Sequence, residues 1–524
     1  MASLLISDYI LAENVSSEVI QFPDGVMILS DDVYMPMQSG DKQTWTYRDV
    51  VVTLKKSKEG IAVFIHSPSQ ALKELQLSWK YSSPNGVKVL GDAWERTYGD
   101  VSFQAVNSAR KMPWYCIEHS AENTVCFGVK TGCSAFCYWR VTESELKLNL
   151  DTRNGGNGVL LGQRTLLAAH IVTTRSNGRE NAFATVRRFC VQMCSKPKKV
   201  KLPVYGINDW YFAYGNNSAD LILKHTALLS PLATNVSNRP FSVIDDGWSA
   251  GSDYTRTNQK FPDMPKLVEE IKQMGMRSGL WTRPLLAKPG TNHKLFIEKH
   301  GEVLDPTIDE NMEYIQGLFS LYKTWGMELI KHDYTTFELF GKYGADMGQV
   351  MTFPGWHFND RTKTNAEIIL QLYTSIRNAS HGIYLIGCNT VSHLSAGLFE
   401  LYRTGDDTSG KEWSRTKKMG VNTLGFRMPQ HKTFYEADGD CVGLTTLVPW
   451  EKNKQWMDLL ARSSTPFFIS AQPEAVGTEQ KRFIKECFDN ASKPLPVGEP
   501  LDWLENTYPA KWKLNNEVVT FNWD

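Results

Sequence analysis

Beyond about residue 203, short apolar segments with the character of β-strands alternate with longer amphipathic segments. This alternation is typical of a parallel α/β domain, because parallel strands need a crossover connection that is usually a helix. The eight predicted strands are 204–209, 241–247, 277–284, 327–333, 383–389, 400–407, 434–440 and 466–472, and the predicted helices include 264–275, 308–326, 364–380 and 411–425. Eight β/α units within about 270 residues match the size of a (β/α)8 TIM barrel.

The preceding part of the chain has a different pattern. Short β-rich segments, among them 61–67, 75–81, 124–132, 134–141 and 146–152, are separated by Gly, Asn, Pro and Ser, which favours an antiparallel β-sandwich. A helix over 180–196 and a lysine-rich linker follow. We therefore predict a multidomain chain: a sandwich with its linker helix (1–198), a catalytic barrel (199–490) and a short C-terminal β segment (491–524).

The charge balance narrows the class of ligand. The 57 basic and 57 acidic residues cancel, so neither nucleic acid nor an anionic membrane is an expected partner, and a neutral ligand fits better. No segment has the run of about 20 apolar residues that crosses a membrane. The nine cysteines have no zinc spacing, and we expect no metal, cofactor or disulfide framework. Residues 1–14 do not resemble a signal peptide, which leaves a cytoplasmic protein or a mature exported form.

Polar residues gather where the predicted barrel strands end. Active sites of such barrels lie at the C-terminal ends of the strands, so these side chains are candidates for chemistry. They are Asn208 and Asp209; Asp245, Asp246 and Trp248; Trp281 and Arg283; Lys331 and Asp333; Cys388 and Asn389; Arg403, Asp406 and Asp407; and Asp438 and Asp440.

Lys331 and Asp333 are two residues apart, so on a strand their side chains leave the same face. A neighbouring ammonium lowers the pKa of a carboxyl group and keeps it ionised, as a nucleophile requires. The alternative is a structural salt bridge.

Asp407 is the preferred general acid at the end of the sixth predicted strand. Strand alternation places it on the face of Arg403, and the charge of the adjacent Asp406 would raise the pKa of one of the two carboxyl groups. Asp406 stays open as the acid, because strand ends fray. Asp245 and Asp246 precede Gly247 and could bind sugar hydroxyls; a metal is the alternative, although no nearby His or Glu completes a ligand set.

These segments resemble the α-galactosidases and raffinose-synthase-like proteins of glycoside hydrolase family 36, and their relatives in families 27 and 31. The similar motifs, from about residue 203 to 472, are IDDGW, KFP followed by GLW, KHD, RTGDDT and ADGDCVGL, together with Cys388. The resemblance implies a retaining exo-α-galactosidase, with Asp333 as nucleophile and Asp407 as acid/base. Together with the positions at the strand ends, the resemblance leads us to predict a substrate-binding set of Asp245, Asp246, Trp248, Trp281, Arg283, Lys331, Cys388, Asn389, Arg403, Asp406 and Asp440.

Some features depart from that pattern. Arg283 follows GLW where the family commonly has Glu, and the loop 334–363 is long and carries Phe353, Trp356 and Phe358, which we expect to shape the leaving-group side. From the sandwich, Trp94 either reaches over the pocket or belongs to the core. The alternatives for function are an α-N-acetylgalactosaminidase, a β-L-arabinopyranosidase, a raffinose-synthase-like galactosyl transferase and an inactive carbohydrate-binding barrel. Homo-oligomer formation stays open.

Overall fold

The computed structural model describes residues 19–30, 32–121, 123–348 and 350–524. The prediction about residues 1–14 lies outside this part of the chain. Within it, the helices are too short or too polar to cross a membrane.

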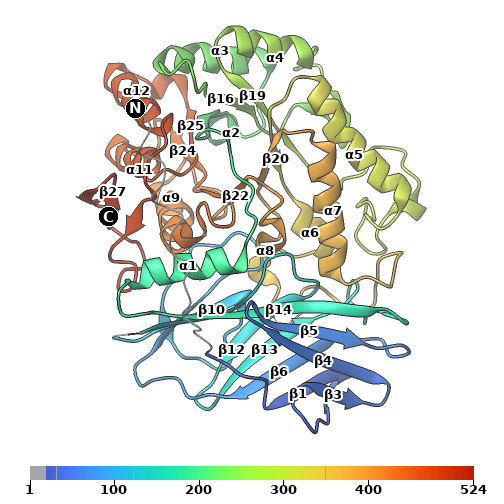
Figure 1. Cartoon of the computed structure of the whole chain (residues 1–524). Coiled ribbons are helices and arrows are strands. Elements are labelled where there is room, and N and C mark those ends of the chain that lie inside the picture. Colours follow the sequence, from blue (N-terminus) through green and yellow to red (C-terminus); the bar gives the residue numbers. More distant parts are fainter. Residues whose placement is uncertain (1–18, 31, 122, 349) are drawn as a thin grey trace, which may run out of the picture.

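The first part of the chain forms two antiparallel sheets, as predicted (Figure 1). The smaller sheet has the order β2-β1-β6-β13-β12-β9, with β1 Gly25–Ser30, β2 Val33–Pro36, β6 Glu74–Lys80, β9 Met112–Pro113, β12 Phe136–Val141 and β13 Glu145–Asp151. The larger has the order β3-β4-β5-β14-β11-β10-β7-β8, with β3 Thr44–Tyr47, β4 Val50–Ser57, β5 Gly60–His66, β7 Lys88–Gly91, β8 Gln104–Ala105, β10 Tyr115–His119, β11 Thr124–Val129 and β14 Thr165–Arg175. Buried and less buried residues alternate along β5, as the period of a strand requires.

The second part forms one curled parallel sheet, in agreement with the α/β prediction. Its order is β23-β22-β21-β20-β19-β16-β15-β25-β24, with β15 Tyr205–Asn208, β16 Phe241–Ile244, β19 Arg277–Thr282, β20 Leu329–His332, β21 Tyr384–Gly387, β22 Leu401–Arg403, β23 Glu436–Asp438, β24 Cys441–Leu444 and β25 Phe467–Ala471. A short hairpin, β17 Ser249–Ala250 and β18 Asp253–Thr257, follows β16.

Helices connect these strands. They are α1 Ala182–Met193, α2 Trp210–Ala213, α3 Ala219–Leu229, α4 Met264–Gln273, α5 Asp309–Thr324, α6 Thr335–Phe340, α7 Asn365–Ala379, α8 Ser392–Ser395, α9 Trp413–Thr416, α10 Thr423–Arg427, α11 Trp450–Arg462 and α12 Thr478–Ala491. Figure 1 shows α3, α4, α5 and α7 outside the parallel sheet, and α1 between that sheet and the antiparallel ones. The predicted helix over 411–425 is interrupted, because the π-helical turn η4 (Lys417–Asn422) separates α9 from α10.

The two edge strands of the parallel sheet, β23 and β24, follow each other in the sequence. The segment predicted as one strand over 434–440 contains β23, and β24 begins directly after that segment, separated from β23 only by Gly439 and Asp440. Asp440 has a φ of 72°, and its N–H donates to Asp438 Oδ1 at 3.0 Å. This left-handed residue redirects the chain from the partner β22 to the partner β25.

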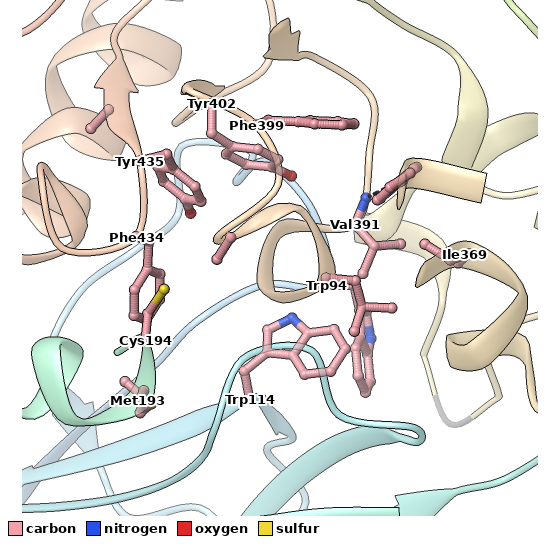
Figure 2. Packing of buried hydrophobic residues seen from close by; sticks show 14 of the residues in the cluster. Trp94, Trp114, Met193, Cys194, Ile369, Val391, Phe399, Tyr402, Phe434 and Tyr435 are labelled. Atoms are coloured by element: carbon pink, nitrogen blue, oxygen red, sulfur yellow. Dashed lines mark hydrogen bonds between the residues drawn. The ribbon is translucent and has the colours of Figure 1, made fainter. Parts of the chain in front are cut away.

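The antiparallel and parallel sheets share a continuous hydrophobic core. Figure 2 shows this junction, where Trp94 and Trp114 face residues that precede and follow β22. Trp94 packs edge-on against Trp114 at 5.3 Å between ring centroids, and the His393 ring stacks on Trp114 at 5.0 Å. Trp94 is therefore a core residue. After α12 a small antiparallel sheet ends the chain, with β26 Glu499–Pro500, β27 Lys511–Leu514 and β28 Glu517–Thr520.

Candidate active site

Asp333 directly follows β20 and is partly exposed. Its Oδ1 accepts the N–H groups of Tyr334 at 2.8 Å and Asn389 at 3.1 Å, and its Oδ2 accepts Trp281 Nε1 at 3.0 Å. Burial raises the pKa of Asp333, but the charge of Arg96, followed by that of Lys331, brings the pKa below its usual value. Asp333 is thus an ionised, oriented carboxylate.

Asp407 is a second partly exposed carboxylate near Asp333. It follows β22, which only β21 separates from β20 in the sheet, and its charge raises the pKa of Asp333. Asp407 Oδ1 lies 3.3 Å from Arg403 Nη2 and 4.0 Å from Arg96 Nη1. The contact with Arg403 agrees with the predicted shared face, although β22 ends at Arg403 and the alternation of a strand does not extend to Asp407.

The adjacent Asp406 does not raise the pKa of Asp407 above its usual value. Burial raises its pKa, but Arg403, Arg96 and Lys331 together hold the pKa well below its usual range. Asp406 does not counteract them, because its own carboxylate is bound by Arg96 and Arg415, each at 2.8 Å. The local excess of guanidinium groups therefore outweighs the repulsion between the adjacent acids.

Arg96 comes from the connection between β7 and β8 of the antiparallel part of the chain. The Thr97 N–H donates to the carbonyl of Thr404 at 2.9 Å, and the Asp406 N–H donates to the carbonyl of Thr97 at 3.0 Å. The backbone of Thr97 thus pairs with the backbone on either side of Gly405, as an added β-strand would. A Cβ at Gly405 would lie 2.0 Å from the carbonyl oxygen of Met419, so only glycine fits beneath this pairing.

Asp245 is more deeply buried than Asp246. It is buried, and its Oδ2 receives Lys331 Nζ at 2.9 Å and Asn208 Nδ2 at 2.7 Å. The nearest ion-pair partner of Lys331 is therefore Asp245, while Asp333 feels the ammonium only through its field. Asp246 is partly exposed, and burial raises its pKa. Of the two, Asp246 offers the more accessible carboxylate.

Arg283 lies against α6, the helix that follows Asp333. Its Nη2 and Nε lie 2.9 Å and 3.0 Å from Glu338 Oε1, and its guanidinium carbon lies 4.0 Å from the centre of the Tyr334 ring. Glu338 is buried in α6, and burial raises its pKa to about 7. The unusual arginine after GLW is thus held by an acid from the helix that follows Asp333.

Several residues predicted to touch substrate lie beneath the site instead. Trp248 and Cys388 have 0% exposed surface, which corrects the prediction that they contact a sugar. Trp248 donates to the carbonyl of Trp281 at 2.9 Å and packs among other aromatic rings, while Cys388 Sγ lies 3.4 Å and 3.5 Å from the guanidinium groups of Arg96 and Arg403. Trp248 thus supports Trp281, and Cys388 packs between Arg96 and Arg403.

Asn389, Arg403 and Asp440 are also almost completely buried. Asn389 orients Asp333 through its N–H group, and Arg403 bridges Asp407 and Asp440, with Nη2 2.9 Å from Asp440 Oδ2. The same oxygen of Asp440 accepts Thr408 N–H and Oγ1, each at 2.9 Å, and the Tyr211 hydroxyl. Asp440 is therefore a bracing residue, and the prediction that it contacts substrate is corrected.

The aromatic residues of the loop 334–363 are not where we expected them. Trp356 and Phe358 are buried, and Phe353 packs with His300 at 5.0 Å between ring centroids. A Cβ at Gly156 would lie 2.1 Å from the carbonyl oxygen of Phe353, which shows how closely the loop packs on the antiparallel part. These three rings anchor the loop and do not face the site.

Sequence reasoning missed three charged residues of the site: Glu95, Arg96 and Glu338. Glu95 is buried and accepts the Asn389 side-chain amide and the Gly344 N–H, the latter at 2.9 Å. Charged residues are almost never fully buried unless they are paired, so the adjacent Glu95 and Arg96 gave no sign of their burial in the sequence. Nothing in the sequence showed that this loop reaches the ends of β20 and β22.

Metal binding has no candidate centre in the described ranges, where no three His, Cys, Asp or Glu side chains are grouped to hold an ion. The negative charges of Asp333 and Asp407 are balanced by the positive charges of nearby cationic side chains, namely Arg96, Lys331 and Arg403.

Comparison with known proteins shows which known fold the chain has. No family model matches the sequence. An α-galactosidase from Escherichia coli is 28% identical over 106 residues, which are 18% of this chain and 14% of that protein. The match therefore spans a small part of the curated relative.

Solved structures match most of the chain. TtGalA, an α-galactosidase from Thermus thermophilus in complex with p-nitrophenyl α-D-galactopyranoside, has a TM-score of 0.62 at 15% identity, with 95% of this chain and 98% of that one covered. The GH36 α-galactosidase AgaA from Geobacillus stearothermophilus has a TM-score of 0.56 at 13% identity, with 87% and 67% covered. The galactosidase domain of AgaSK, an alpha-galactosidase-sucrose kinase, has a TM-score of 0.57 at 13% identity, with 89% and 73% covered. The chain thus has the fold of the GH36 α-galactosidases.

Proposed function

We propose that this protein is a retaining glycoside hydrolase of the family 36 type that releases terminal α-linked galactose. The observation that carries the proposal is the pair Asp333 and Asp407. They are two partly exposed carboxylates near the C-terminal ends of β20 and β22, close enough to influence each other and surrounded by cations. Two carboxyl groups on either side of a glycosidic bond are the usual equipment for its hydrolysis.

In the proposed reaction Asp333 attacks the anomeric carbon while Asp407 gives a proton to the leaving oxygen. Water then attacks the glycosyl-enzyme, and Asp407 accepts a proton from it. The three donors to Asp333 fix its carboxylate plane, and Trp281 Nε1 steadies Oδ2. The low pKa of Asp407 keeps it ionised, which is the form that accepts a proton from water in the second step, whereas the first step requires its protonated form.

The proposed roles of the other side chains follow from their exposure. Asp246 binds a sugar hydroxyl, while Lys331 and the buried Asp245 form the ion pair that supports it. Arg403 holds Asp407, and Arg96 and Arg415 hold Asp406 away from the acid/base role. We thus favour Asp407 over Asp406 as acid/base.

The proposal includes the domain organisation. We infer a closed (β/α)8 barrel within 199–490, in which β23 and β24 together form the seventh strand, because they pair with β22 and β25 at the two ends of the sheet. The sandwich with its helix (1–198) supplies Arg96, and the small sheet of 491–524 is an appendage.

The test is a panel of p-nitrophenyl glycosides that differ at one ring position, with the anomer of the first-formed sugar followed by proton NMR. We expect the highest kcat/KM on the α-D-galactoside and initial release of α-galactose. Preference for the α-N-acetylgalactosaminide or the β-L-arabinopyranoside would change the assigned sugar. Initial release of β-galactose would contradict retention, and binding without turnover on all members would contradict hydrolysis.

A further inference from the structure

We propose that a cavity at the N-terminal end of the parallel sheet binds a small sugar phosphate, with the lysine-rich linker supplying part of its positive charge. The cavity has a volume of about 250 Å³ and lies between the linker that precedes β15, the start of β23 and the segment after α12. Asp333 and Asp407 follow β20 and β22 at the other end of the same sheet. The cavity is therefore separate from the proposed active site.

Positive charge dominates the walls of this cavity. Four lysines from three separate segments line it together with a single acid: the lysines are Lys199, Lys201, Lys432 and Lys493, and the acid is Glu436. Among the residues that the structure describes, none of the four ammonium groups forms a direct ion pair or a hydrogen bond. Several unmatched ammonium groups around one cavity suit a multiply charged anion such as a phosphate group, which lysine binds as a point charge.

Lys432 is the least solvated of these lysines. It is partly buried, whereas the other three are exposed. Burial lowers the pKa of Lys432, the charge of Glu436 opposes this shift, and the charge of Arg187 adds to it. Arg187 donates to the carbonyl of His431 at 2.9 Å, so a further cation lies beside the same turn. A bound anion would replace the solvation that burial removes from Lys432.

Glu436 is a buried acid that faces the cavity. It begins β23, is 8% exposed, and its carboxyl group accepts no hydrogen bond from the described residues. His431 Nε2 lies 3.6 Å from Glu436 Oε2, which is too far for a hydrogen bond. Burial raises the pKa of Glu436 to about 7, although the charges of Lys432 and Lys199 lower it. A sugar hydroxyl in the cavity would give this buried group the partner that it lacks.

These walls fit the parts of a sugar phosphate. The lysines bind the phosphate, Glu436 binds a hydroxyl group, and apolar side chains such as Leu202 and Leu495 contact the carbon skeleton. The volume of about 250 Å³ lies just below the range of about 300–1,000 Å³ for pockets that hold drug-sized ligands. The ligand is thus limited to about one sugar unit with its phosphate.

Hydrogen bonds hold the walls of the cavity in place. The Lys201 N–H donates to the Tyr384 hydroxyl at 2.9 Å, which fixes the linker on β21. On the opposite wall, Ser464 Oγ lies 2.9 Å from His431 Nε2. A preformed cavity of this kind loses little conformational entropy when a ligand binds.

The test is isothermal titration calorimetry of the full chain at neutral pH and fixed ionic strength, with glucose 6-phosphate, inorganic phosphate and glucose as ligands. We expect glucose 6-phosphate to bind with a Kd below about 1 mM, inorganic phosphate to bind about tenfold more weakly, and glucose to bind too weakly to measure. Glucose 6-phosphate at about 10 mM should also raise the melting temperature by several degrees, because it binds the folded chain.

Variants separate the cavity from charge in general. Lys432→Met should weaken the binding of glucose 6-phosphate about tenfold and Lys199→Met about threefold, since Lys432 is less solvated. Lys199 is exposed, so its replacement keeps the test valid even when Lys432→Met does not fold. Lys58→Met removes the same charge from the exposed turn between β4 and β5 and should stay within about twofold of wild type. Glu436→Gln should bind inorganic phosphate about twofold more tightly or better, because the cavity loses its negative charge.

Absence of heat and of a rise in melting temperature with either phosphate would overturn the site. Equal losses of affinity in Lys432→Met, Lys199→Met and Lys58→Met would overturn it too, because binding would then follow net charge alone. Equal affinity for the two phosphates would overturn the assignment of a sugar ester and make free phosphate the ligand. Calorimetry needs no turnover, so each of these outcomes is independent of hydrolysis at the active site.

Discussion

Two sets of carboxylates at strand ends look alike in sequence and differ in the structure. Asp333 and Asp407 are partly exposed, and each keeps an open side toward the site. Asp438 and Asp440 are buried at the break between β23 and β24, where burial raises the pKa of Asp438 to about 6 and Asp440 is braced by Arg403, Thr408 and Tyr211. We propose that the first set reacts, whereas Asp440 of the second set holds Arg403 in place.

The difference shows that a cation of the site can pair with two kinds of carboxylate, one partly exposed and one buried. Arg403 contacts both the partly exposed Asp407 and the buried Asp440. A buried charge must be paired, whereas a catalytic carboxylate must keep one oxygen accessible. Loss of a member of the first set should therefore reduce turnover, and loss of a member of the second should reduce stability.

The largest effect is expected for Asp333→Ala. Removal of the nucleophile should reduce kcat on p-nitrophenyl α-galactoside by about 10³-fold or more, while the melting temperature stays near that of wild type because the side chain is partly exposed. Steady-state kinetics and thermal unfolding of the same preparation check both parts. A variant with near-normal kcat would remove Asp333 from the reaction.

For Asp407→Ala the loss should depend on the leaving group. A sugar alkoxide needs a proton and a nitrophenolate does not, so kcat/KM should fall about 10² to 10³-fold on melibiose and much less on the aryl galactoside. Added azide should restore aryl turnover, because the anion attacks the glycosyl-enzyme without help from a base, gives α-galactosyl azide and releases Asp333. The same pattern in Asp406→Ala, and its absence in Asp407→Ala, would exchange the roles of the two residues.

Asp440→Asn tests the buried set of carboxylates. The ion pair of Arg403 with Asp440 is buried, and breaking it should lower the free energy of unfolding by about 3 kcal/mol. We expect a clear fall in melting temperature and a smaller loss of kcat than for Asp333→Ala. An unchanged melting temperature together with a 10³-fold loss of kcat would show that Asp440 acts on substrate.

The smallest expected effect concerns pH. Arg96 lowers the pKa of both Asp333 and Asp407, so Arg96→Met should raise both values. The acidic limb of kcat/KM, where the nucleophile must be ionised, and the alkaline limb, where the acid must be protonated, should then both shift upward by about one pH unit. Movement of the limbs in opposite directions would contradict this assignment, and Arg96→Lys should restore the wild-type profile in part.

Much of the fold was predictable because the pattern is local. Each of the eight strand segments contains a parallel strand, and the helices over 264–275, 308–326 and 364–380 agree with α4, α5 and α7. The break at Asp440 was not predictable, since it depends on a left-handed backbone at a residue other than glycine. The same holds for η4, where i→i+5 turns have no clear sequence signal.

The sequence predicted which residues gather at the candidate site, but it did not predict how deeply each of them is buried. Strand ends identified Asp333, Asp407 and Asp246, whereas only tertiary packing shows that Trp248 and Cys388 have no exposed surface. The pKa of Asp407 could not be inferred from Asp406 alone, because Arg96 comes from a loop some 310 residues earlier in the chain. Long-range contacts of that kind leave no trace in spacing.

The most direct test of the central claim is to trap the glycosyl-enzyme. Wild-type protein is incubated with 2-deoxy-2,2-difluoro or 5-fluoro α-galactosyl fluoride, digested, and mapped by tandem mass spectrometry. We predict one added fluorosugar per chain, bound to Asp333 in the peptide that contains Lys331 and Tyr334, and none in Asp333→Ala. A label on another carboxylate, or inversion of configuration without any label, would contradict the account.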